Sequence, residues 1–181
     1  MTPAELLAAG GVLAIPTESS YGLGVDPRDP RGVEAIYRLK GRERGKALPI
    51  VAADVAQLLA LGVVSDCEPL VWARPHWPAA ITMILPLGAP IAASAGVPTI
   101  AARIPAHEGL RTLLARFLRI LAGDGESPLS DPVAVRNWLA TSGEEFLVVD
   151  QGETAGGPPS TLVELRDGEV VILRKGRDEI R

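Results

Sequence analysis

Short apolar runs alternate with helix-start signals along most of this chain, and this alternation restricts its fold more than any other feature. Residues 11–16 (GVLAIP) and 47–52 (ALPIVA) have the length and composition of buried strands. A capping residue followed by proline marks expected helix starts at Thr2, Asp29 and Asp131. Strands that alternate with helices predict a sheet built partly from parallel neighbours.

The C-terminal part of the chain has a different pattern. Residues 160–165 (STLVEL) and 169–174 (EVVILR) flank Asp167-Gly168, a dipeptide typical of a tight antiparallel hairpin. Together the two patterns predict an α/β protein, with a twisted open mixed sheet and flanking helices. Further strands are expected within residues 79–87, 99–105 and 118–122, and further helices within residues 54–62 and 107–117.

Length and composition favour a single domain over residues 1–181, because 47% of the residues are hydrophobic and can fill one core. No apolar run approaches the roughly 20 residues that span a bilayer, and the first residues lack signal-peptide character, so no membrane partner is expected. The single cysteine, Cys67, fits a reducing cytoplasm. With only His76 and His107 beside it, the chain cannot build a Cys/His metal cluster, and no metal ligands are expected.

A polar segment, residues 16–24 (PTESSYGLG), directly follows the first predicted strand. Ligands of α/β proteins gather at the carboxyl ends of strands, so Ser19 and Ser20 could bind a small polar ligand there. Tyr21 would add a ring with a polar tip. Glycines and hydroxyl side chains also build tight turns, and for this segment alone a turn is the better interpretation.

Four cations occupy the short segment of residues 40–46 (KGRERGK). Lys40, Arg42, Arg44 and Lys46 repel one another unless they are solvated or face an anion, and phosphate is the usual anion. The segment is one spacer short of a P-loop and lacks the hydroxyl that would hold magnesium, which excludes that motif. A phosphate site and a solvated basic loop are equally compatible with it. The formal net charge of −4 argues against non-specific nucleic-acid coating, but not against a local basic patch.

Arg103 falls at the end of the strand expected within residues 99–105, where an unpaired guanidinium would be costly. It therefore needs an anionic partner, either a protein carboxylate or a substrate carboxylate. His107 starts the next helix and fits a cap better than a general base. Ser160 and Arg174 stand at strand ends of the hairpin and could face either a pocket or a plain surface.

No Ser-His-Asp arrangement, paired catalytic carboxylates or G-x-G-x-x-G turn is recognisable in the sequence. Any chemistry must therefore rest on positioning and on charge neutralisation.

Taken in order, these segments resemble the motifs of the YrdC-like family of threonylcarbamoyl-AMP synthases. The family motif PT-[DE]-[ST]-x-YGL is matched by residues 16–23, and its K-x-R segment with a following Lys or Asn by Lys40, Arg42 and Lys46. Motifs like WPGPLTLIL, TVAxRxPxH, STVVDL and LRxG are similar to residues 77–85, 99–107, 160–165 and 173–176. The resemblance covers nearly the whole chain, and several weak motifs in one order are far more specific than any single motif.

The resemblance implies a twisted open α/β sheet around a large, concave, positively charged cavity. It implies a nucleotidyltransferase that uses ATP to condense L-threonine with bicarbonate or CO2, giving threonylcarbamoyl-AMP and pyrophosphate. Magnesium would be carried by the phosphates of ATP. A downstream threonylcarbamoyl transferase would then modify an adenosine in certain tRNAs.

The resemblance also implies roles for individual residues. The family's threonine-binding positions correspond to Ser19, Arg103 and Ser160. Its ATP-binding positions correspond to Arg42, Lys46, Thr99 and Arg174, with Lys40 close by. No residue is expected to act as an acid or base, and Arg42 and Lys46 would act by positioning.

One family segment has no counterpart. Where the family carries a TSAN-x-SGE-like sequence, residues 118–132 read LRILAGDGESPLSDP, which leaves Ile120, Leu121 and Ala122 in place of the Ser and Asn, or a deletion. Asp124 adds negative charge near the expected phosphates. Two hypotheses follow: a working synthase with a rebuilt loop, or an impaired paralogue that serves as a nucleotide- or RNA-binding module. The remaining motifs favour the synthase.

Overall fold

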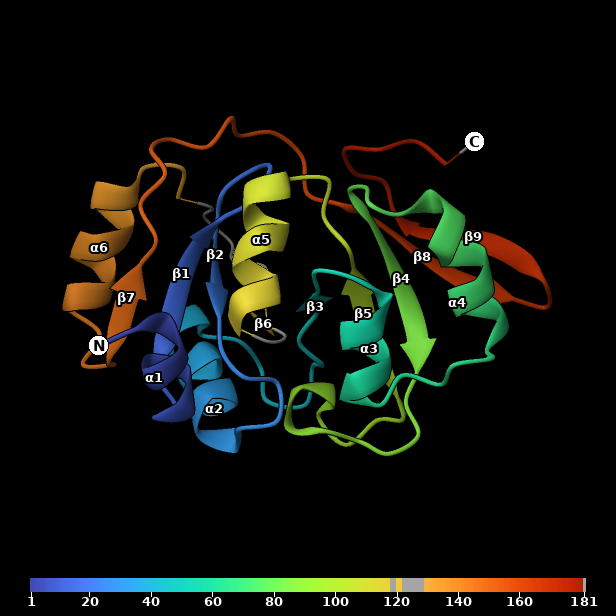
Figure 1. Ribbon diagram of the computed structural model, residues 1–181, viewed down its shortest axis with the longest axis horizontal. Coiled ribbons are helices and arrows are strands. Elements are labelled where there is room, and N and C mark those ends of the chain that lie inside the picture. Colours follow the sequence, from blue (N-terminus) through green and yellow to red (C-terminus); the bar gives the residue numbers. More distant parts are fainter. Residues whose placement is uncertain (118–119, 122–128, 181) are drawn as a thin grey trace.

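The computed structural model describes residues 1–117, 120–121 and 129–180, whose strands form two open sheets (Figure 1). The smaller sheet has the order β2 (Tyr21–Gly24), β1 (Val12–Pro16), β7 (Phe146–Val148). The larger sheet has the order β6 (Ile120–Leu121), β3 (Ile50–Val51), β5 (Thr99–Arg103), β4 (Ile81–Pro86), β8 (Thr161–Arg166), β9 (Glu169–Arg174). Both sheets are mixed: β1 is antiparallel to β2 and parallel to β7, and β4 is antiparallel to β5 and parallel to β8. The predicted open mixed α/β architecture is confirmed, with its strands divided between two sheets.

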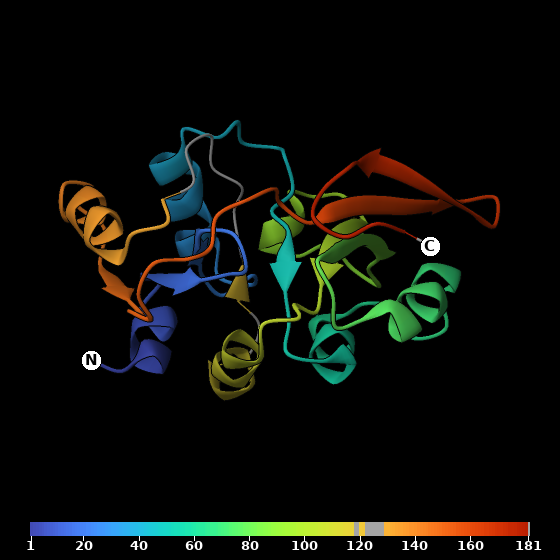
Figure 2. The same ribbon diagram turned by 90° about the horizontal axis from the view of Figure 1, so that it is seen from above.

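The helices lie on both sides of these sheets. One side carries α1 (Pro3–Ala8), α3 (Val55–Leu61), α4 (Glu68–Ala73) and α5 (Glu108–Phe117). Toward the opposite side lie α2 (Pro30–Lys40), α6 (Pro132–Ala140) and the β8–β9 hairpin (Figure 2). Short 3-10 turns occur at η1 (Arg74–His76) and η2 (Ala92–Ser94). None of the helices in the described part of the chain is both long and apolar enough to cross a membrane.

The predicted helix starts are confirmed by their capping hydrogen bonds. Thr2 forms a capping box with Glu5, Asp29 accepts from the Arg31 amide, and Asp131 accepts from the amides of the first turn of α6. Helix α2 ends at Gly41 in the left-handed conformation, with φ of 56°. These signals are local in sequence, so the sequence alone predicted them correctly.

Three elements were not anticipated: β2, β7 and α4. Residues 21–24 were expected to continue a loop, but they turn back along β1 and pair with it, with Ile15 opposite Gly22. All four residues of β2 are buried, so packing overrides the poor strand propensity of its glycines. Helix α4 begins after Cys67 without a side-chain cap hydrogen bond, which removes the usual sequence signal.

Two clusters of buried hydrophobic residues join the two sheets. The larger cluster joins Val12 and Leu23 of the smaller sheet to Ile50 and Met83 of the larger one, and the second cluster joins β1 to β3. This shared core supports the prediction of one domain, which stays a prediction.

Candidate functional site

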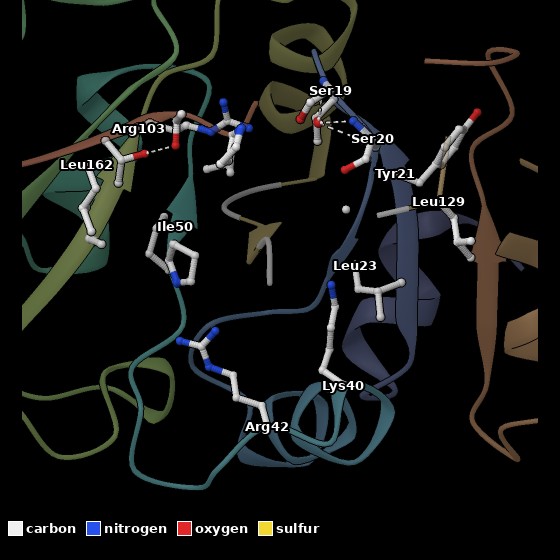
Figure 3. A pocket seen from close by; sticks show the side chains of 18 of the residues that line it. Ser19, Ser20, Tyr21, Leu23, Lys40, Arg42, Ile50, Arg103, Leu129 and Leu162 are labelled. Carbon is white, nitrogen blue, oxygen red and sulfur yellow. Dashed lines mark hydrogen bonds between the residues drawn. The ribbon is translucent and has the colours of Figure 1, made fainter. Parts of the chain in front are cut away.

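A cavity of about 830 Å³ is lined by residues from both sheets and from α2 and α6 (Figure 3). Six of the residues predicted to bind ligands contribute to its lining: Ser19, Lys40, Arg42, Arg103, Ser160 and Arg174. Within the described part of the lining, the charged side chains are the four cations of this set. The predicted convergence of distant cations and hydroxyls is therefore observed, while their roles toward ligands stay predictions.

Thr17 builds the turn that presents Ser19 and Ser20 to this cavity. The Thr17 hydroxyl donates to the Ser20 carbonyl at 2.7 Å and accepts from the amides of Ser19 and Ser20 at 3.3 Å each. The Thr154 hydroxyl fixes the same turn from outside, because it donates to the Ser19 carbonyl at 3.0 Å. The turn interpretation is confirmed by the hydrogen bonds of Thr17. The two serines also line the cavity, and their binding of a ligand stays a prediction.

The polar tip of Tyr21 has a structural use. Its hydroxyl donates to the Gly152 carbonyl at 2.8 Å and accepts from the Gln151 amide at 3.2 Å. Tyr21 is therefore one of the lining residues, and its hydroxyl anchors the segment after β7.

Arg103 is paired with a protein carboxylate. Its Nη1 lies 3.1 Å from Oε2 of Glu18, and the two side chains are only 11% and 13% exposed. The anionic partner is thus Glu18, which lies within the polar segment of residues 16–24 and was not among the predicted site residues. Oε1 of Glu18 is buried and makes no hydrogen bond to the described residues. Glu18 and Arg103 are far apart in sequence. The sequence predicted only that an arginine at a strand end needs an anion, and it could not identify which one.

A hydroxyl pair forms another part of the wall. The hydroxyls of Thr82 and Ser160 lie 2.7 Å apart because β4 and β8 run parallel, with Thr82 opposite Leu162. Nη2 of Arg174 donates to the Ser160 carbonyl at 3.1 Å, which holds this guanidinium beside the pair. Thr82 was missed, because one threonine in an apolar strand carries no signal of its own.

The first half of the basic segment faces the cavity. Lys40 and Arg42 extend from the end of α2 toward the same space (Figure 3). Nη2 of Arg42 donates to the Ala47 carbonyl at 3.0 Å, and its buried Nε has no partner among the described residues. The Tyr37 hydroxyl donates to the Lys46 carbonyl at 2.9 Å and fastens this loop to α2, and burial raises the pKa of Tyr37.

The second half of the basic segment is solvated. Arg44 forms an ion pair with Glu34, and Lys46 forms one with Glu43 at 2.9 Å while its side chain is 65% exposed. The hydrogen bond from Lys46 lowers the pKa of Glu43. Of the predicted ATP ligands, Lys46 lies outside the described lining, as does Thr99 at the start of β5. Their assignment to ATP rests on the sequence resemblance alone.

His107 is a capping residue, as expected. Its Nδ1 accepts from the Leu110 amide at 2.9 Å in the first turn of α5. It lines a separate cavity of about 180 Å³, together with Glu18.

The segment that departs from the family motif is only partly described. Ile120 and Leu121 form β6, antiparallel to β3, whereas Ala122 and Asp124 lie outside the described residues. Across residues 1–117, 120–121 and 129–180, no group of three or more His, Cys, Asp or Glu side chains could hold a metal ion.

Comparison with known proteins identifies the family. The Sua5/YciO/YrdC family model, described as telomere recombination, matches residues 5–176. A protein of Thiobacillus denitrificans named threonylcarbamoyl-AMP synthase is 32% identical over 174 residues, which cover 91% of this chain and 90% of that protein. A Pyrococcus abyssi protein of the same name is 32% identical over 181 residues, covering 96% of this chain and 52% of that protein. The structure of P. abyssi Sua5 complexed with L-threonine is 30% identical, with a TM-score of 0.80 over 96% of this chain and 52% of that one.

The chain therefore spans about half the length of its Pyrococcus relatives and most of its Thiobacillus relative. The family model matches residues 5–176, and the Thiobacillus protein is 32% identical with 90% of its length covered. The chain therefore belongs to the Sua5/YciO/YrdC family.

Proposed function

We propose that this protein is an enzyme that condenses L-threonine, bicarbonate or CO2, and ATP into threonylcarbamoyl-AMP and pyrophosphate. The observation that carries the proposal is the convergence of Ser19, Arg42, Arg103, Ser160 and Arg174 on one cavity. Relatives named threonylcarbamoyl-AMP synthase support the same reaction. A volume of about 830 Å³ is in the range of small-molecule sites.

Threonine is assigned to the part of the cavity formed by Ser19, Arg103 and Ser160. Glu18 engages one nitrogen of Arg103, and a guanidinium has further N–H donors for a substrate carboxylate. The P. abyssi Sua5 structure with L-threonine supports threonine as the amino acid.

The cations are assigned to the nucleotide. Lys40, Arg42 and Arg174 would offset the phosphate charge that otherwise repels an incoming carbamate. A carbamate oxygen would attack the α-phosphorus, and the bond to pyrophosphate would break while the same cations stabilise the leaving charge. Magnesium, bound mainly through phosphate oxygens and water, would neutralise further charge. No acid or base is assigned.

The product would serve tRNA modification. Threonylcarbamoyl-AMP is a mixed anhydride, so a separate transferase would be needed to pass its acyl group to an adenosine in tRNA. Such a partner and a cytoplasmic location, which the single Cys67 favours, complete the proposal.

Release of pyrophosphate by the purified protein tests the reaction. We expect release that requires ATP, threonine and bicarbonate together, and a product with the mass of threonylcarbamoyl-AMP. Arg103→Ala should abolish most of this release, whereas Arg166→Ala, an exposed arginine paired with Glu164 on β8, should not. ATP binding without any pyrophosphate release would overturn the synthase assignment and favour a nucleotide-binding paralogue.

A further inference from the structure

Trp138 is a large aromatic side chain in the cavity wall that the proposed chemistry does not use. It lies on α6 and remains 37% exposed. The chain's other tryptophans have structural partners: Trp77 is buried and its Nε1 donates to the Ile81 carbonyl at 2.7 Å, and Trp72 stacks on His76. Within the described part of the chain, no acceptor meets the Trp138 indole N–H. An open indole in a cavity wall is a candidate contact for a ligand.

The neighbours of Trp138 form an apolar surface. Ala134 and Val135 lie one turn earlier on α6, so the three side chains share one helix face and line the cavity together. Leu39 of α2 also lines the cavity, and α2 and α6 both lie toward the end of the molecule opposite the β8–β9 hairpin (Figures 1 and 2). The part of the cavity wall formed by α6 is therefore apolar, and Trp138 is its most exposed side chain.

Cations line the same cavity as this apolar surface. Lys40 is the last residue of α2, next to Leu39, and Arg42 follows after the Gly41 cap. Hydroxyls and further cations come from the larger sheet on the other side, at Thr82, Ser160 and Arg174. An apolar platform followed by cations matches a nucleotide, which has a flat base at one end and phosphates at the other.

We propose that Trp138 is the platform on which the adenine base of ATP stacks, with the phosphates directed toward Lys40 and Arg42. This assignment rests on the proposed function for the presence of ATP. Base–aromatic stacking supplies affinity through the π-face of the base and does not require hydrogen-bond readout. Trp138 thus sets affinity for the base and does not act on the reacting atoms.

The test compares a ligand that has a base with one that lacks it. Isothermal titration would measure binding of ATP and of inorganic triphosphate to the wild type, Trp138→Ala and Trp138→Phe. Trp72→Phe on α4 is the matched control, because Trp72 stacks on His76 and is not part of the described cavity lining. Far-UV circular dichroism of each variant checks that α6 is retained.

Stacking is worth about 1–3 kcal/mol per base, so Trp138→Ala should weaken ATP binding by about 5- to 150-fold. Triphosphate binding should be unchanged, Trp138→Phe should retain most of the ATP affinity, and Trp72→Phe should behave as wild type. ATP, but not triphosphate, should also quench wild-type tryptophan emission, and this quenching should disappear in Trp138→Phe.

Two failures are distinguishable. If Trp138→Ala binds ATP as tightly as wild type, or loses ATP and triphosphate affinity equally, the platform is wrong while pyrophosphate release can still support the synthase. If the wild type binds no ATP, the proposed function fails and the platform fails with it.

Discussion

At the scale of single residues, the ion pair between Arg103 and Glu18 fixes the charged groups that this part of the cavity wall presents to a ligand. The pair is almost enclosed, so removing either partner leaves a buried charge uncompensated. A substrate carboxylate would join a guanidinium whose orientation is already fixed, which lowers the cost of ordering it on binding.

Arg103→Ala should weaken threonine binding much more than ATP binding. A hydrogen bond to a charged group contributes about 1.5–3 kcal/mol, so a loss of about 10- to 100-fold in threonine affinity is expected. Calorimetric titration of each ligand measures the difference, with Arg166→Ala as the exposed control. Equal losses for the two ligands would remove the carboxylate-clamp assignment.

The basic segment offers a comparison between neighbouring cations. Arg42→Ala should reduce ATP affinity by about tenfold and leave threonine binding unchanged, because Arg42 lines the cavity. Arg44→Ala is the matched control, since Arg44 faces solvent and pairs with Glu34. Lys46→Ala is also predicted to reduce ATP affinity, on the family resemblance alone. Unchanged affinity in that variant would assign Lys46 to the solvated half of the loop.

At the scale of elements, predictability follows the distance over which the determining contacts act. Caps at Thr2, Asp29 and Asp131 act within one turn, so the sequence located these helix starts. The Asp167-Gly168 hairpin is equally local, and both residues adopt positive φ as its turn requires. Strand β7 depends on pairing with β1, which lies far away in sequence, and it was missed. Strand β2 pairs with β1 across a short turn, and it was missed because its glycines and the preceding hydroxyl residues favour a loop.

The same distinction applies to the cavity. From the sequence, the cluster of like charges identified Lys40 and Arg42. Polar residues directly after or at the end of apolar strands identified Ser19 and Arg103. The partners that complete the wall, Glu18 and Thr82 among them, become visible only when the sheets form. A single exposed tryptophan such as Trp138 has no sequence signal that separates a platform from a surface residue.

Helix α6 allows a test of how a local cap supports the cavity. Asp131 accepts from the amides of Val133 and Ala134 at 3.0 and 3.2 Å. Asp131→Ala should lower the free energy of unfolding by about 1 kcal/mol, whereas Asp131→Asn, which also caps, should stay close to wild type. Urea denaturation followed by circular dichroism measures both. Equal destabilisation by the two substitutions would show that the cap hydrogen bonds are not the cause.

At the scale of the whole molecule, the cavity exists only when both sheets are assembled. Ser19 and Ser20 come from the turn of the smaller sheet, and Arg103, Ser160 and Arg174 come from the larger one. The core that joins the sheets therefore also sets the spacing between the proposed threonine and nucleotide ends of the cavity. A ligand that touches both ends binds the folded state and not the unfolded chain.

Thermal unfolding with ligand measures this coupling. ATP at about 100 times its dissociation constant should stabilise the folded state by about 2.7 kcal/mol, which for a chain of this size raises Tm by about 5–10 °C. At the same ATP concentration, Arg42→Ala should show about half that gain in stability, because the gain rises with the logarithm of the ATP concentration divided by the dissociation constant. Arg44→Ala should show the full gain. Calorimetric ATP binding without a rise in Tm would mean that ATP also binds the unfolded chain, and the argument that the site needs both sheets would fail.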